Sequence, residues 1–89
     1  MADGGDGLED LVARIVADRF AALGLPGSPA PEEDLREAGL TSLALVDLIF
    51  LVEDGCGVEI PDAEVNPGNF ATVRSIAGMV ARLRTRSAA

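Results

Sequence analysis

The chain has 89 residues, which is enough for one small domain with a thin core. It has no His and a single Cys, which excludes Ser-His and Cys-His catalytic pairs, an intrachain disulfide and His- or Cys-cluster metal sites. Fifteen acids against seven Arg give a net charge of −8, which is the wrong sign for binding nucleic acid or an anionic membrane.

The charge is distributed unevenly along the chain. Residues 1–64 hold all 15 acids and three Arg, a net −12, whereas residues 65–89 hold four Arg and no acid. This acidic body favours basic partners. Residues 1–7 are acidic and Gly-rich, unlike a signal peptide, and the longest apolar run is far too short to span a bilayer. We therefore expect a cytoplasmic monomer with a flexible acidic lead over residues 1–7.

The first predicted helix covers residues 8–23, where apolar residues recur at steps of three and four. Gly24 follows the last of them, as is typical of a helix C-terminus. Residues 24–40 contain three Pro and are predicted to form a long loop, anchored on the core by Leu35 and Leu40. Loops of this length in compact domains usually carry a function.

The second predicted helix is capped by Thr41 or Ser42 and runs to about Asp54. Residues 55–57, Gly-Cys-Gly, end it. At about 100° per residue from Ser42, one arc of this helix is purely aliphatic and should face the core. That arc comprises Leu45, Leu48, Ile49 and Val52.

A short extended piece, a one-turn helix over residues 61–65 and a last helix after Thr72 complete the chain. The last helix carries an apolar stripe, and its Arg82, Arg84 and Arg86 complement the negative end of the helix dipole. The predicted fold is all-α, with three long helices, one short helix and a long loop between the first two. We place the domain at residues 8–84 and a flexible tail at 85–89.

Ser42 is the one residue placed for covalent chemistry. A serine at the start of a helix exposes its hydroxyl beside unpaired backbone N–H groups and the positive end of the helix dipole. A phosphate ester would be stabilised there. By position and residue type alone, however, Ser42 is more often a simple helix cap.

Five segments occur here in the order found in acyl and peptidyl carrier proteins, and the chain resembles that family from Leu8 to Leu83. The segments are Gly39-Leu40-Thr41-Ser42-Leu43 and residues 46–48, 53–54, 57–62 and 69–73. The resemblance implies a four-helix acyl-carrier-like bundle in which a phosphopantetheinyl transferase attaches 4′-phosphopantetheine from coenzyme A to Ser42.

The resemblance also implies what the chain does. The arm's thiol holds acyl or aminoacyl groups as thioesters for a loading enzyme and for downstream condensing or tailoring enzymes, and the chain itself catalyses nothing. The lack of His and of Cys clusters separately predicts that it binds no metal. The motif resembles acyl more than peptidyl carriers, and we expect polyketide or nonribosomal peptide biosynthesis. The alternatives are a fatty-acid-synthesis carrier and an unmodified acidic helical adaptor with the same fold.

Three positions depart from the family pattern. Thr41 stands where an Asp is usual, Ala44 where an acid is frequent, and Cys56 where a bulky apolar residue is common. Thr is also a competent helix cap, so helix entry should survive, whereas a charge available to the transferase is lost. Cys56 is expected to be a small, partly buried hydrophobe.

Three large apolar residues of the second helix fall in the same sector of the wheel as three acids, on the predicted solvent side. An exposed patch of this kind is typical of a partner-docking surface, with the apolar groups giving affinity and the acids giving steering. The alternative is a helix buried on most sides. The predicted docking residues are Thr41, Leu43, Val46, Asp47, Phe50, Glu53 and Asp54.

Overall fold

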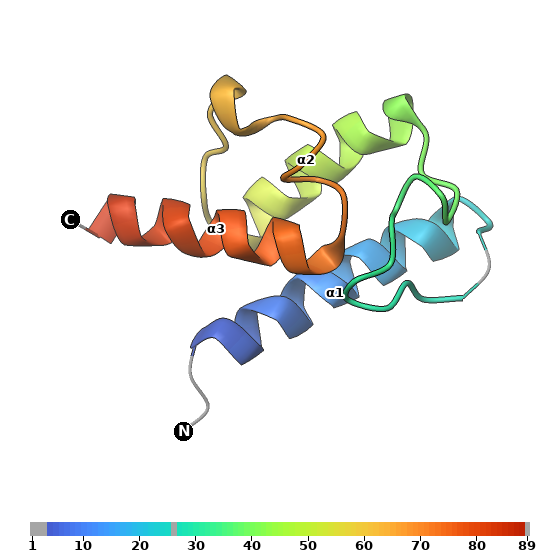
Figure 1. Ribbon diagram of the computed structural model, residues 1–89, viewed down its shortest axis with the longest axis horizontal. Helices are drawn as coiled ribbons and strands as arrows, with labels where there is room; N and C mark the ends of the chain where they lie inside the picture. The colour runs from blue at the N-terminus through green and yellow to red at the C-terminus, as the bar shows by residue number, and fades with distance from the viewer. Residues whose placement is uncertain (1–3, 26, 89) are drawn as a thin grey trace.

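The computed structural model describes residues 4–25 and 27–88 (Figure 1). Its elements are α1 (Gly4–Ala22), α2 (Ser42–Cys56), η1 (Asp62–Glu64) and α3 (Val73–Ala88). This is the predicted all-α fold with three long helices, and the predicted short helix is a single 3-10 turn. None of the helices in these ranges is long and apolar enough to cross a membrane.

The helix ends differ from the prediction. Helix α1 begins at Gly4 rather than at Leu8, and α3 runs to Ala88 rather than stopping at 84. The apolar stripe that guided the prediction marks only turns that touch the core, so it misses helical turns beyond the core edge. No Pro interrupts either extension. Of the predicted flexible ends, residues 1–3 and 89 lie outside the described residues, as does Pro26 in the loop.

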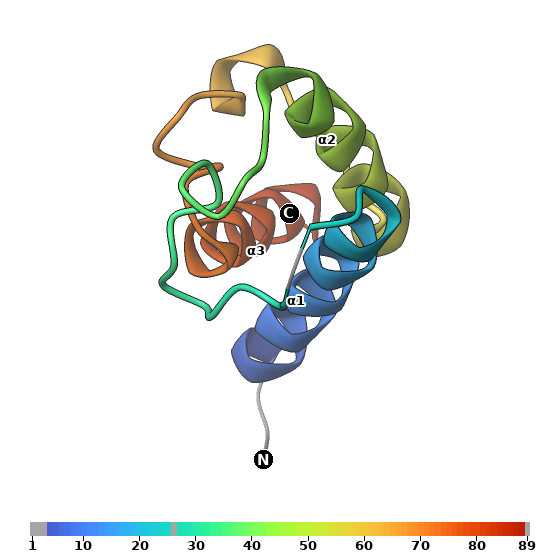
Figure 2. The same cartoon turned by 90° about the vertical axis from the view of Figure 1, so that its right-hand side faces the viewer.

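Helix α1 packs against both α2 and α3 (Figure 2). The core is mostly aliphatic, with Phe20 and Phe70 as its aromatic residues. Each helix buries one row of side chains at helical spacing. The rows are Leu8, Val12, Val16 and Phe20; Ala44, Leu48, Val52 and Cys56; and Val73, Ile76, Ala77, Met79, Val80 and Leu83. The buried row of α2 confirms Leu48 and Val52, while Leu45 and Ile49 pack half-buried at its edge.

The long loop from α1 to α2 is fastened to the start of α3. Leu35 is fully buried, and its backbone N–H donates to the Ala71 carbonyl at 2.8 Å. The backbone N–H of Arg74 donates to the Pro31 carbonyl at 2.9 Å. Leu40, which directly precedes α2, is also buried. The predicted anchors therefore hold, and the loop delivers the chain to the first turn of α2 in a fixed position.

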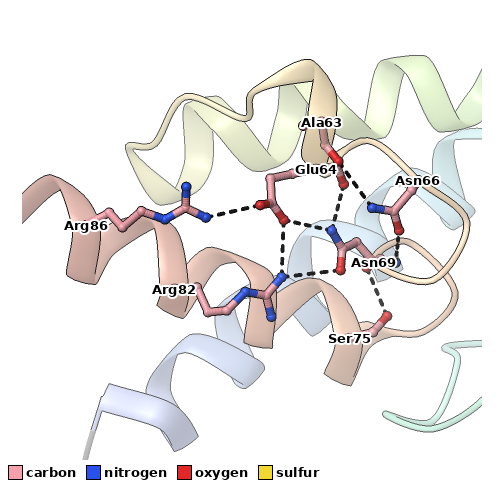
Figure 3. Close-up of polar contacts among 7 residues, drawn as sticks. All are labelled: Ala63, Glu64, Asn66, Asn69, Ser75, Arg82 and Arg86. Atoms are coloured by element: carbon pink, nitrogen blue, oxygen red, sulfur yellow. Dashed lines mark hydrogen bonds and ion pairs between the residues drawn. The ribbon is translucent and has the colours of Figure 1, made fainter.

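Glu64 of η1 is bound to Asn69 and to Arg82 and Arg86 of α3 (Figure 3). We call these four residues the Glu64 network. Arg82 and Arg86 donate to the two carboxylate oxygens of Glu64 at 3.2 and 3.1 Å, and Asn69 Nδ2 donates to Glu64 Oε1 at 2.9 Å. Two of the arginines predicted to complement the helix dipole therefore hold the segment before α3 in place.

Candidate functional site

Thr41 and Ser42 have different roles at the start of α2. Thr41 is the N-cap: its backbone is extended, and its Oγ1 accepts a hydrogen bond from the Ala44 N–H at 3.2 Å. Ser42 is the first helical residue, its side chain is exposed, and its Oγ has no hydrogen-bond partner among the described residues. The interpretation of Ser42 as a simple cap is therefore wrong, and its hydroxyl is available.

The turn before Thr41 requires glycine. Gly39 has a φ of 121°, which side-chain-bearing residues rarely adopt, and a Cβ there would meet Leu25 Cδ2 at 2.9 Å. The backbone N–H of Leu40 donates to the Leu35 carbonyl at 2.9 Å. With Leu40 buried, these contacts turn the chain so that Ser42 points outward.

The first turn of α2 fits a phosphate ester. The backbone N–H of Leu45 donates to the Thr41 carbonyl, whereas the N–H groups of Ser42 and Leu43 have no partner in the part of the chain that the structure describes. No acid lies in this first turn, so nothing there opposes the positive end of the helix dipole. Two free donors and the positive end of the dipole therefore lie at the end of the helix that begins with Ser42.

A pocket of about 240 Å³ opens beside Ser42, between the start of α2 and the segment that precedes α3. Its wall is mostly apolar, with Arg36 as the one charged residue. The lining residues are Arg36, Leu40, Thr41, Ser42, Leu45, Val65, Asn66, Pro67 and Phe70. An apolar pocket next to an exposed hydroxyl fits a flexible arm that is anionic at its root and largely neutral beyond it.

The structure shows the exposed apolar face that was predicted for α2. Leu43, Val46 and Phe50 are 84%, 49% and 63% exposed, so the alternative of a helix buried on most sides is wrong. Leu51, at 40% exposed, belongs to the same surface and was missed by the sequence analysis. It lies at about 180° on the helical wheel, between the predicted core arc and the acidic sector. The sequence could have revealed it, because a large apolar residue outside the core arc is a candidate for the exposed apolar surface.

The three acids of this face are not equivalent. Asp54 is exposed and, within residues 4–25 and 27–88, has no partner. Asp47 forms an ion pair with Arg19 of α1 at 2.5 Å but remains 56% exposed. Glu53 is half-buried, and its Oε2 accepts the Ile60 N–H at 2.8 Å.

The placement of Glu53 on the open solvent side is therefore wrong, because the chain folds back over the end of α2. Gly57, with a left-handed φ of 67°, makes this reversal. The carboxylate of Glu53 accepts a backbone N–H of the returning segment, so its first role is to stabilise the fold rather than to contact a partner.

Cys56 faces the core as predicted. Its side chain is buried, and burial raises the pKa of the thiol, an effect that Arg84 partly offsets. A buried thiol that stays protonated is a poor nucleophile. Cys56 therefore acts as a small core hydrophobe.

The family model for the phosphopantetheine attachment site matches residues 10–83. The chain belongs to this carrier family. The aminoacyl carrier protein of Agrobacterium fabrum is 36% identical over 64 residues, which cover 71% of this chain and 77% of that protein. Aminoacyl carrier protein 1 of Bradyrhizobium diazoefficiens is 36% identical over 56 residues, covering 63% of this chain and 62% of that protein.

Two solved structures have the same fold. A chain in the crystal structure of the Bradyrhizobium japonicum glycine:[carrier protein] ligase complexed with glycylated carrier protein matches with a TM-score of 0.74 and 26% identity, covering 81% of this chain and 96% of that chain. A chain in the engineered ligase complexed with the carrier protein from Agrobacterium tumefaciens and AMP matches with a TM-score of 0.71 and 32% identity, covering 82% and 97%.

Family membership defines the general role of the chain. Its covalent cofactor is 4′-phosphopantetheine, and the chain is a carrier and a substrate of other enzymes rather than a catalyst. The exposed hydroxyl of Ser42, the free backbone N–H groups beside it and the adjoining apolar pocket fit this cofactor.

Proposed function

We propose that the chain is an aminoacyl carrier whose Ser42 bears the phosphopantetheine arm. The observation that carries this proposal is the exposed Ser42 hydroxyl, left without a partner among the described residues because Thr41 takes the capping role. In the attachment reaction the hydroxyl loses its proton and its oxygen bonds to the pantetheine-bearing phosphorus of coenzyme A. The pyrophosphate bond breaks and adenosine 3′,5′-bisphosphate leaves. Once attached, the arm supplies a thiol that carries acyl or aminoacyl groups as thioesters.

The aminoacyl cargo is supported by the relatives. Both are named aminoacyl carriers, and the matching structures are complexes with a glycine:[carrier protein] ligase. The partners we propose are a phosphopantetheinyl transferase, an aminoacyl-loading ligase and downstream condensing or tailoring enzymes, all acting in the cytoplasm.

A second candidate is an acyl carrier of polyketide or nonribosomal peptide biosynthesis. The motif Gly39-Leu40-Thr41-Ser42-Leu43 favours it, because this form resembles acyl rather than peptidyl carriers. The two candidates share Ser42 and its arm, and they differ in the cargo and in the enzyme that loads it onto the thiol.

We propose that the loading enzyme docks on the outer face of α2, which we call the docking strip: Leu43, Val46, Asp47, Phe50, Leu51 and Asp54. The strip offers exposed apolar area beside Ser42, which a partner must cover to gain affinity. Asp54 adds negative charge at the edge of the strip, as does Asp47, which is paired with Arg19 but still exposed. With a net −12 over residues 1–64, the complementary partner surface is basic with an apolar centre.

Loading assays test the cargo. The modified protein is incubated with ATP, the Bradyrhizobium japonicum glycine:[carrier protein] ligase and labelled amino acids, with Ser42→Ala as the control. We expect hydroxylamine-labile label on the wild type and none on the variant. Loading by a malonyl- or acyltransferase, with no amino acid accepted from the ligase, would favour the acyl carrier. A chain that never accepts the arm from several transferases would be the unmodified adaptor.

A further inference from the structure

We infer that Arg36 positions the arm by pairing with its phosphodiester at Ser42, an inference that rests on the proposed function. Arg36 comes from the long loop, and it is the charged residue of the 240 Å³ pocket that opens beside Ser42. It also lines a second, more open hollow with Thr41 and Ser42. Arg36 and Ser42 therefore line both hollows together.

Most arginines of the described residues have a side-chain partner, but the guanidinium of Arg36 has none. Four of the seven arginines form ion pairs, and Arg84 donates to the Cys56 carbonyl. In the described ranges, the guanidinium groups of Arg14 and Arg36 make neither a hydrogen bond nor an ion pair. Arg14 lines neither hollow. Because Arg36 has no carboxylate partner among the residues that the structure describes, it is available to another anion.

The acids near Arg36 compete only weakly for it. Asp34 and Glu37 line the outer hollow but not the pocket. Asp34 Oδ1 accepts the backbone N–H groups of Arg36 and Glu37 at 2.9 and 3.0 Å, so this carboxylate is engaged by the turn. Glu37 is exposed, and a solvated carboxylate holds an arginine with little net free energy.

A phosphodiester on Ser42 completes the arrangement. The residues that would hold its non-bridging oxygens are Ser42 and Leu43, through their free backbone N–H groups, and Arg36, through its guanidinium. Guanidinium matches phosphate geometry with two parallel hydrogen bonds, which a lysine or a backbone N–H does not provide. Arg36 thereby directs the root of the arm toward the apolar pocket.

Phosphorus NMR of the modified protein tests this pairing. We compare the wild type, Arg36→Gln, Arg36→Lys and the charge-matched control Arg14→Gln, each checked for an unchanged melting temperature. In low salt the ³¹P resonance of the folded wild type should differ from that of the same modified protein unfolded in urea, which keeps the phosphodiester, and this difference should shrink as salt screens the pair. Arg36→Gln should lose the difference, Arg36→Lys should keep part of it, and Arg14→Gln should keep it all. The Arg36 Nε–H resonance should also move between the unmodified and the modified wild type.

The outcomes separate this inference from the proposed function. If intact mass shows that all variants accept the arm but Arg36→Gln keeps the wild-type ³¹P resonance, only the inference is overturned. The same holds if Arg14→Gln changes the resonance as much as Arg36→Gln does. If no variant and no wild-type protein accepts the arm at Ser42, the proposed function and the inference both fail.

Discussion

Thr41 and Ser42 are adjacent hydroxyl residues, but only Thr41 contributes to the fold through its side chain. We expect Thr41→Ala to lower the free energy of unfolding by about 0.5–2 kcal/mol, the usual cost of a lost N-cap, and Thr41→Asp to retain most of it. Ser42→Ala should stay within about 0.5 kcal/mol of the wild type, as surface changes do. Urea unfolding of the unmodified protein measures all three. A Ser42→Ala variant as unstable as Thr41→Ala would contradict the assignment of the cap.

Phe50 is predicted to act in docking rather than in stability, because it is 63% exposed. Phe50→Ala should leave the free energy of unfolding within about 1 kcal/mol of the wild type. It should also slow aminoacyl loading clearly, because a partner loses apolar contact beside Ser42. The matched control is Leu48→Ala on the buried side of α2, which should cost about 2–5 kcal/mol. Loss of stability of about 3–5 kcal/mol in Phe50→Ala would place the residue in the core instead.

At the scale of the elements, helical periodicity predicted the three long helices and the buried side of α2, since core contact repeats every three or four residues. The same signal could not set the ends of α1 and α3, where the turns leave the core. Nor could it place Glu53, whose partner Ile60 depends on how the chain reverses after Gly57. The candidate site was predicted as far as Ser42 through the family motif. The pocket, and with it the role proposed for Arg36, depends on tertiary packing, which spacing along the chain does not encode.

The stabilisation that the Glu64 network gives to the packing of η1 on α3 should depend on pH. Hydrogen bonds from Arg86 and then Arg82 hold the pKa of Glu64 below its ordinary value of 4.5. A lowered folded-state pKa means that the stabilisation is present above pH 4.5 and is lost as the pH falls through the folded value. Glu64→Gln should therefore have a lower melting temperature than the wild type at neutral pH, and the gap should narrow below pH 4.5.

The control for this prediction is Glu59→Gln, because Glu59 is exposed and lies outside the network. Its gap to the wild type should be small at every pH. Amide hydrogen exchange should also quicken over residues 61–72 in Glu64→Gln, since the network holds this segment. A gap that stays constant or widens on acidification would contradict the role given to Glu64.

The whole molecule folds against its own charge. The net charge is −8, and −12 over residues 1–64, so repulsion among the acids opposes compaction. The exposed ion pairs add little stability against this repulsion. Raising NaCl or Mg²⁺ from low to moderate concentration should therefore raise the melting temperature near neutral pH. A double variant, Glu33→Gln with Glu37→Gln, should respond less steeply. A melting temperature that stays flat or falls with salt would show that charge repulsion does not limit the stability of this fold.

The central claim, that Ser42 bears the arm of this carrier, is tested most directly by intact mass after incubation with coenzyme A, Mg²⁺ and a broad-specificity phosphopantetheinyl transferase. We predict one added phosphopantetheinyl group on the wild type, located on Ser42 by fragmentation, and an unchanged mass for Ser42→Ala. Thr41→Ala, which removes the neighbouring hydroxyl, should still gain the group. A Ser42→Ala chain that gains it, or a wild-type chain that several transferases leave unmodified, would contradict the claim.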